Sequence, residues 1–306
     1  MPFPRPAILT DREWPLAHGA QRAVVAARGG ALRSYQVGDR ALVDGWADGE
    51  LPPAFNGAVL APWPNRLRGG RWHHEGRELR LPITEPDRGA ALHGLVVWAD
   101  WNLFDRRPDA LTLGCRVPAQ PGYPFELALR VRWSLTEAGL RCDLAVTNTG
   151  TGTCPFGIGA HPFFGFEQHA VDELTLTLPA RTAVTTDARL LPTGRVPADP
   201  ALAAGRGLAG LALDTAFTDL EREPDGGSRL RLASGSGTLT VWADGAFGWW
   251  QVYTSDAFDP GDPRYRRSVA LEPMTCGPDA LNTGEDLVWL APGHSWSGSW
   301  GARLHG

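Results

Sequence analysis

Apolar and polar residues alternate over long stretches of the chain with the period of two that is typical of β-strands. Residues 125–135 show it most clearly, and residues 140–147 repeat it after the short segment 137–139. Two such runs around a glycine-containing turn predict an antiparallel hairpin with one face in water. Shorter alternating runs predict further strands at residues 174–178, 230–232 and 239–241.

Helical periodicity is nearly absent from the sequence. Only residues 200–207 favour a short helix, with Asp199 in position to cap it. The 37 glycines and 26 prolines are scattered, which favours many short strands joined by turns. No change in composition marks a boundary. We therefore predict an all-β fold, one large antiparallel β-sandwich that forms a single domain over residues 1–306.

The charge of the chain excludes several classes of function. The formal net charge is -5 at pH 7, so no electrostatic footprint for nucleic acid is expected. All positive side chains are arginines, because the sequence contains no lysine. Schiff-base catalysis, pyridoxal-phosphate anchoring and a phosphate-loop lysine are therefore excluded.

The cysteines and the N-terminal segment indicate a cytoplasmic protein. Cys115, Cys142, Cys154 and Cys276 are widely spaced and lack metal-ligand spacing, so reduced thiols are favoured over disulfides and no metal is expected. Residues 1–6 contain no apolar stretch suited to a signal peptide, and no segment has the length of a membrane span. We expect a monomer or a homodimer with no membrane partner.

Two segments that end in a rigid proline carry the strongest chemical signal. His161 precedes Pro162, and Glu272 lies between the apolar Leu271 and Pro273, so each is expected at the end of a strand and fixed by the proline that follows it. A reaction in which one group takes a proton while another group gives one requires a base and an acid in fixed positions. A carboxylate and an imidazole can fill these two roles. Taken singly, His161 could be a buried core histidine and Glu272 a buried ion-pair partner. Their occurrence together favours catalysis.

Five short motifs, taken in order, resemble the aldose 1-epimerase (galactose mutarotase) family. The resemblance extends from about residue 29 to residue 300. It implies the galactose mutarotase-like supersandwich, a large antiparallel β-sandwich with a concave sugar-binding face, which agrees with the strand pattern. The motifs are Pro62-Trp63-Pro64-Asn65-Arg66, Leu92-His93-Gly94, Gly159-Ala160-His161-Pro162-Phe163-Phe164, Leu213-Asp214-Thr215-Ala216-Phe217 and Leu271-Glu272-Pro273-Met274-Thr275.

The resemblance also implies roles for these residues. His161 matches the general acid and Glu272 the general base, while His93 matches a second histidine that hydrogen-bonds the sugar near its ring oxygen. Such an enzyme opens an aldose ring by removing the proton of the anomeric hydroxyl and protonating the ring oxygen, and the ring then closes on either face. This reaction requires no cofactor. The implied partner is a free aldohexose.

Further residues are implied to hold the sugar hydroxyls. Asn65 and Arg66 match the Asn-Arg motif of the family. Asp214 matches an aspartate that binds hydroxyls, although the residues after it differ from the usual pattern. Asp219 is the alternative at this position.

Aromatic residues are candidates for stacking on a sugar ring. Most of the 13 tryptophans are expected in the core, Trp133 among them. Trp63 and residues 247–250 are the better stacking candidates, and either Gln251 or Tyr253 is expected to line the cleft.

Two alternative functions stay open at this point. Arg66, Arg68 and Arg71 could together bind a hexose that carries a phosphate or a sulfonate, because guanidinium groups match such oxyanions. A sugar-binding module without catalysis would keep the fold but would not need a matched acid and base. A glycoside hydrolase is disfavoured, since it normally uses two carboxylates.

Overall fold

The structure is a computed structural model that describes residues 12–43, 45–47, 50–254, 258 and 260–305. Residues 1–6, on which we based the expectation of no signal peptide, lie outside the described residues. In the part of the chain that is described, no helix is long and apolar enough to cross a membrane. The cysteines form no disulfide, as expected from their spacing.

The predicted hairpin is confirmed. β12 (Leu127–Thr136) pairs antiparallel with β13 (Gly139–Asn148), and Thr136 faces Gly139 across the turn. Val131 and Trp133 are buried, whereas Arg130 and Arg132 on the opposite face are exposed. The alternation of the sequence therefore separates a core face from a solvent face.

The shorter predicted strands and the predicted helix are confirmed, although they begin or end at other residues than predicted. The three shorter strands are observed as β17 (Thr175–Thr177), β22 (Ser228–Ser234) and β23 (Gly237–Ala243). The predicted helix is α1 (Pro200–Ala204), and the Asp199 carboxylate accepts the Ala201 N–H at 2.9 Å. The helix ends before residue 207, because Arg206 and Gly207 join a sheet as β20.

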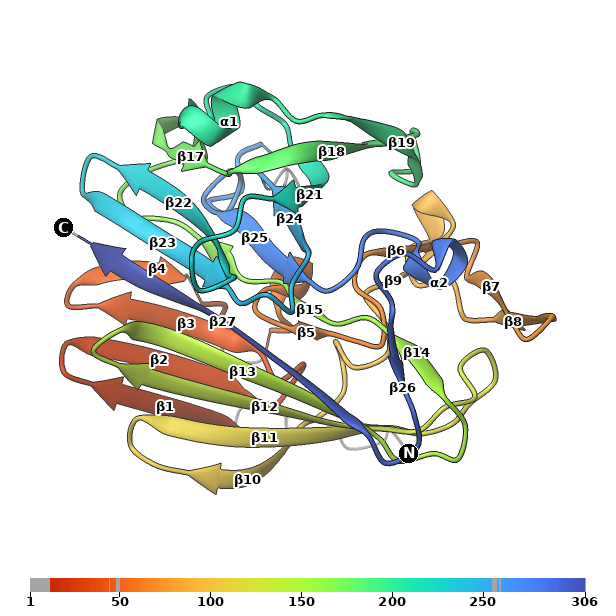
Figure 1. Cartoon of the computed structure of the whole chain (residues 1–306). Coiled ribbons are helices and arrows are strands. Elements are labelled where there is room, and N and C mark those ends of the chain that lie inside the picture. Colours follow the sequence, from red (N-terminus) through yellow and green to blue (C-terminus); the bar gives the residue numbers. More distant parts are fainter. Residues whose placement is uncertain (1–11, 44, 48–49, 255–257, 259, 306) are drawn as a thin grey trace, which may run out of the picture.

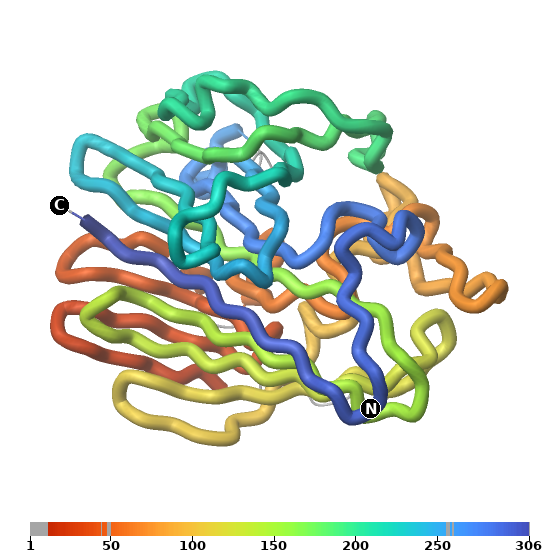
Figure 2. Tube along the Cα trace, viewed as in Figure 1, coloured from red at the N-terminus to blue at the C-terminus, as the bar shows by residue number. Residues whose placement is uncertain are grey.

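Two large antiparallel sheets dominate the described part of the chain (Figures 1 and 2). The nine-stranded sheet has the order β10 (Asn102–Arg106), β11 (Ala110–Val117), β12, β13, β27 (Ser295–His305), β23, β22, β17, β20 (Arg206–Gly207). The eight-stranded sheet has the order β19 (Pro192–Pro197), β18 (Ala180–Thr186), β21 (Asp214–Leu220), β24 (Trp249–Tyr253), β25 (Val269–Met274), β15 (Gly159–Ala160), β5 (Val59–Leu60), and β16 (Phe163–Phe164) also pairs with β25.

Smaller elements complete the described structure. A four-stranded sheet contains β1 (Glu13–His18), β2 (Gln21–Ala26), β3 (Leu32–Val37) and β4 (Arg40–Val43). The strand pairs are β6 (Arg66–Arg68) with β9 (Ala90–Leu92), β7 (Arg71–His74) with β8 (Arg77–Arg80), and β14 (Cys154–Phe156) with β26 (Val288–Leu290). The short helices are η1 (Pro53–Phe55), η2 (Pro86–Arg88), η3 (Val171–Glu173) and α2 (Ala280–Thr283).

The hydrophobic core takes buried side chains from the two large sheets and from the four-stranded sheet. Trp250 on β24 donates its indole N–H to Ser228 Oγ on β22 at 2.9 Å, which joins one sheet to the other. Trp133 is fully buried, as predicted. Trp63, Trp249 and Trp250 are also buried, and none of them lines the cavity described below, so the expectation that they stack on a sugar is wrong. The all-β antiparallel sandwich is confirmed.

Candidate functional site

One cavity of about 940 Å³ brings the predicted site residues together. Its lining includes all six of them, although they come from distant parts of the chain: Asn65, Arg66, His93, His161, Asp214 and Glu272. The cavity opens beside the eight-stranded sheet, and its size falls within the usual range for small-molecule sites.

The sheet itself aims three polar side chains into this cavity. Gln251 on β24 lies directly opposite Glu272 on β25. Asp214 on β21 faces Tyr253, which is two residues from Gln251 and therefore on the same face of β24. Glu272 lies inside β25, not at the end of an apolar strand as the sequence indicated, because the strand continues through Pro273 and Met274.

His161 is fixed by its own backbone. The His161 N–H donates to the Ala58 carbonyl at 3.0 Å, and the His161 carbonyl accepts the Gly57 N–H at 2.8 Å. The ring Nε2 lies 3.3 Å from Glu272 Oε1. His161 Nδ1 and Glu272 Oε2 are buried and have no hydrogen-bond partner among the described residues. A polar ligand can therefore gain hydrogen bonds here that the protein does not supply.

The protonation of His93 is determined by its neighbour. The ring Nδ1 of His93 accepts the backbone N–H of Asn65 at 3.2 Å. The backbone N–H of His93 donates to the Asn65 carbonyl at 3.0 Å. Burial and the nearby His161 lower the pKa of His93 well below its ordinary value. A neutral ring that accepts at Nδ1 carries its proton on Nε2. His93 is therefore a hydrogen-bond donor toward the cavity.

This tautomer also bears on metal binding. His93, His161 and Glu272 place their ligand atoms within 4.8 Å of one another, a set that zinc uses in some catalytic sites. A histidine that binds a metal normally donates its other ring N–H to an acceptor. His93 does the reverse, since its second nitrogen accepts an N–H. The donor set suits proton transfer and sugar binding better than a metal ion.

Burial shifts the pKa values of His161 and Glu272 in opposite directions. Burial lowers the pKa of His161 to about 4, and the Arg66 charge adds to this effect. Burial and the neighbouring Asp214 raise the pKa of Glu272 well above its ordinary value. Both shifts favour the neutral forms, so the pair favours a carboxylic acid that donates to a neutral imidazole. The two groups titrate as a unit.

A relay of polar side chains lines the cavity wall. Asn65 Nδ2 donates to Gln251 Oε1 at 3.2 Å, and Gln251 Nε2 donates to Asp214 Oδ1. Asp214 Oδ2 lies 3.5 Å from Arg66 Nη1. The sequence suggested Gln251 or Tyr253 as lining residues without choosing between them, and both line the cavity.

Arg66 is held by a residue that the sequence did not reveal. Glu85 accepts from Arg66 Nε at 2.8 Å and from Nη2 at 3.0 Å, which is a bidentate pair. Burial opposes the Arg66 charge, but Glu85 and Asp214 outweigh it and raise the pKa of Arg66. Glu85 precedes a proline in a loop, and only the tertiary contact shows its importance.

Phe55 is a second residue that sequence reasoning missed. Its ring centroid lies 5.0 Å from that of His93 and 6.2 Å from that of His161. Ala54 and Phe55 both have positive φ, at 48° and 62°. Consecutive left-handed residues other than glycine are unusual and concentrate at functional sites. Phe55 therefore provides an apolar wall beside both histidines.

Three other candidates lie outside this cavity. Asp219, the alternative to Asp214, accepts a hydrogen bond from Thr182 and lines a separate surface hollow, so it is wrong as a site residue. Arg68 pairs with Asp279 at 3.3 Å, and Arg71 is exposed on β7. Neither of these arginines joins Arg66 in the cavity, so the expected cluster of three is wrong.

The sequence and the fold are similar to those of aldose 1-epimerases. The aldose 1-epimerase family matches residues 12–301, and the chain belongs to this family. It is 32% identical over 282 residues to YihR of Escherichia coli, which is described as uncharacterized, with 91% of this chain and 88% of YihR covered.

Solved structures show the same fold. The GalM/aldose epimerase homologue of C. elegans superposes with a TM-score of 0.85 at 19% identity, covering 96% of this chain and 99% of that one. Galactose 1-epimerase of Lactobacillus acidophilus gives a TM-score of 0.81 at 17% identity, covering 96% and 95%. The resemblance inferred from the five motifs is thus confirmed at the level of family and fold.

Proposed function

We propose that the chain is an aldose 1-epimerase that interconverts the α and β anomers of a neutral aldohexose. The observation that supports this most is the buried pair of His161 and Glu272, with 3.3 Å between Nε2 and Oε1. The two sugar oxygens that exchange protons in ring opening are both bonded to the anomeric carbon. An acid and a base must therefore lie close together to serve them.

Glu272 acts as the base and His161 as the acid. Glu272 takes the proton of the anomeric hydroxyl while His161 protonates the ring oxygen, so the bond between the anomeric carbon and the ring oxygen breaks and an aldehyde forms. The aldehyde rotates about its bond to the next carbon. Ring closure on the other face reverses both proton transfers and yields the other anomer.

The pair carries one proton throughout this cycle. With a closed ring, the productive form is a Glu272 carboxylate and a His161 imidazolium. With an open chain, it is a carboxylic acid and a neutral imidazole. Burial favours the second arrangement, since it raises the pKa of Glu272 and lowers that of His161. The site therefore stabilises the protonation state of the open-chain intermediate.

The remaining polar residues bind the sugar. The Nε2–H of His93 donates to an oxygen near the reacting centre, as its tautomer requires. Arg66, Asp214 and Asn65 bind ring hydroxyls from the wall of the cavity. Hydroxyls suit this wall because donors and acceptors alternate along it.

The charges of the cavity favour a neutral sugar over a phosphorylated one. Arg66 is already paired with two carboxylates, and Arg88 at the rim lies 3.4 Å from Glu85. Asp87 adds a further acidic group to the lining. A phosphate or sulfonate would therefore compete with carboxylates for each arginine.

Polarimetry tests this function. Freshly dissolved α-D-glucose or α-D-galactose should approach rotational equilibrium faster with the protein than without it. α-D-Glucose 6-phosphate should respond much less at equal concentration, and the reverse order would favour a substituted sugar. If no common aldose is accelerated, the proposed activity is ruled out.

A further inference from the structure

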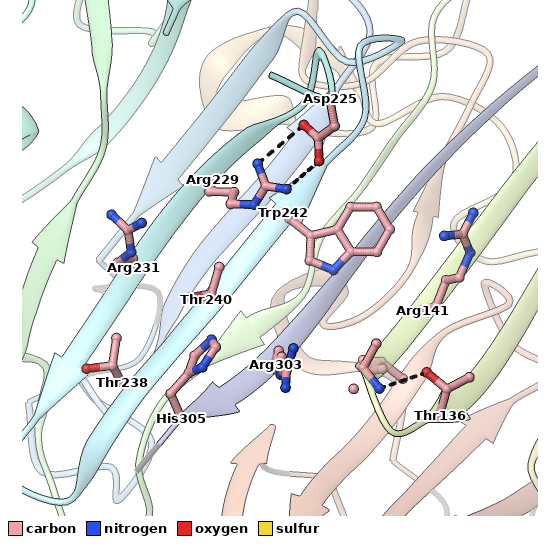
Figure 3. Close-up of a pocket in the computed structure, with 13 residues that line it drawn as sticks. Thr136, Arg141, Asp225, Arg229, Arg231, Thr238, Thr240, Trp242, Arg303 and His305 are labelled. Atoms are coloured by element: carbon pink, nitrogen blue, oxygen red, sulfur yellow. Dashed lines mark hydrogen bonds and ion pairs between the residues drawn. The ribbon is translucent and has the colours of Figure 1, made fainter. Parts of the chain in front are cut away.

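The solvent face of the nine-stranded sheet carries a second hollow, of about 810 Å³ (Figure 3). It lies between the turn of the β12–β13 hairpin and strands β22, β23 and β27. We call it the arginine face and define it by Arg141, Arg229, Arg231, Trp242 and Arg303. None of these residues belongs to the catalytic cavity.

Two of the arginines are not neutralised. Arg231 lies opposite Thr240, and Thr240 lies opposite Arg303, so one row across three strands reads Arg-Thr-Arg. At about 4.8 Å per strand, their Cα atoms are about 10 Å apart, and both side chains can reach a common point. Neither guanidinium has a hydrogen bond or ion pair with any described residue, and both side chains are exposed.

The neighbouring arginines behave differently. Arg229 pairs with Asp225, and Arg141 pairs with Asp143 at 2.8 Å. These two carboxylates thus neutralise Arg229 and Arg141, and they leave Arg231 and Arg303 without an acidic partner among the described residues. The positive electrostatic potential of this face is therefore concentrated at Arg231 and Arg303. A site of this size suits one oxyanion and not a long polyanion.

Trp242 provides a flat surface beside Arg231 and Arg303. It lies opposite Gly301, where a Cβ atom would come within 2.8 Å of the indole Nε1 and Cζ2. Only glycine leaves room for the ring in this position. The Arg141 guanidinium lies over the ring at 5.5 Å from its centroid, and Figure 3 shows the indole broadside above the strands. An aromatic face held in this way can stack on a sugar ring.

We propose that the arginine face binds a pyranose that carries an oxyanion, such as a carboxylate, a phosphate or a sulfate. Arg231 and Arg303 hold the oxyanion from two sides, and the Thr240 hydroxyl lies between them as a further donor. The sugar ring rests against Trp242. This site is separate from the epimerase cavity and does not depend on the function proposed for it.

Isothermal titration with methyl β-D-glucuronide tests the proposal, because this glycoside cannot open its ring. The double variant Arg231→Ala/Arg303→Ala should bind it about tenfold or more weakly than the unmodified protein. Its mutarotation of neutral glucose should be unchanged. The matched control is Arg106→Ala/Arg116→Ala, which removes the same charge from exposed positions on β10 and β11 of the same sheet. This control should bind the glucuronide normally.

Further probes define the ligand class. Glucose 6-phosphate should also lose affinity in the double variant, whereas methyl β-D-glucoside should not. Trp242→Ala should weaken the glucuronide but not inorganic phosphate. Equal glucuronide affinity in the two double variants would overturn the proposal. So would inorganic phosphate binding as tightly as the sugar acids, or a single-stranded oligonucleotide binding where the sugar acids do not.

Discussion

His161 Nε2 and Glu272 Oε1 lie 3.3 Å apart at the buried end of the cavity, and each group retains one polar atom without a partner in the described structure. Leaving buried polar atoms unsatisfied costs stability. Such an arrangement persists where function requires it. We therefore attribute the unsatisfied polar atoms of this pair to hydrogen bonds with sugar oxygens and not to a contribution to folding stability.

Replacing Glu272 tests its proposed role as the base directly. Glu272→Gln keeps the size of the side chain but removes its ability to take a proton. We expect kcat to fall about 10²–10⁴-fold, with KM little changed, since the lost interaction acts in the transition state. Polarimetry with α-D-galactose measures both constants.

The control is Glu173→Gln, which makes the same change on an exposed residue beside His169. It should leave kcat and KM unchanged. The melting temperature of Glu272→Gln should not fall, because the amide replaces a carboxyl group that burial already keeps neutral by raising its pKa. A large rise in KM with an unaltered kcat would assign Glu272 to binding instead of catalysis.

The pH profile should show that the pair carries one proton. Burial raises the pKa of Glu272 and lowers that of His161 to about 4. On acidification, the second proton must enter the imidazole, so kcat/KM should fall only as the pH approaches about 4. On alkalinisation, the last proton leaves the carboxylic acid, and kcat/KM falls above the ordinary range of a carboxyl group. An acid limb centred near the ordinary histidine value of 6.5 would contradict this account.

The sequence predicted the sheets well because period-two alternation is a local signal. β12 and β13 need only their own residues to define which face is buried. The same holds for His161 and Glu272, whose flanking prolines mark them without reference to the rest of the chain. Their convergence could be inferred only from the family resemblance. The single-domain organisation and the cytoplasmic location stay predictions.

Other features depend on contacts between remote segments. Glu85 resembles any loop carboxylate until the fold places it against Arg66. Trp249 and Trp250 looked like stacking residues because no local pattern distinguishes a buried indole from one that lines a cleft. Asp214 and Asp219 could not be ranked from the sequence. The register of β21 against β24 selects Asp214, because it lies opposite Tyr253 in the cavity.

Glu85 should matter for affinity without taking part in the chemistry. Glu85→Gln weakens the bidentate contact that orients Arg66, so the guanidinium loses its fixed direction toward the sugar. We expect KM to rise about tenfold with a smaller change in kcat, a loss typical of one charge-assisted hydrogen bond. Glu78→Gln is the matched control, because Glu78 pairs with Arg80 on the exposed β8. Equal effects of the two substitutions would show that Glu85 does not position Arg66.

Gly94, the residue that follows His93, should not tolerate a side chain. Gly94 has a φ of +80°, and a Cβ atom there would lie 2.1 Å from the Ala61 carbonyl oxygen. Gly94→Ala should therefore destabilise the protein by about 2 kcal/mol or more, since it adds a backbone clash to left-handed strain. Gly76→Ala isolates the clash, because Gly76 has a similar φ of +75° but a Cβ atom there would meet nothing within 4 Å among the described residues. Urea unfolding of both variants measures the difference, and equal losses would mean that the segment around His93 can move aside at little cost.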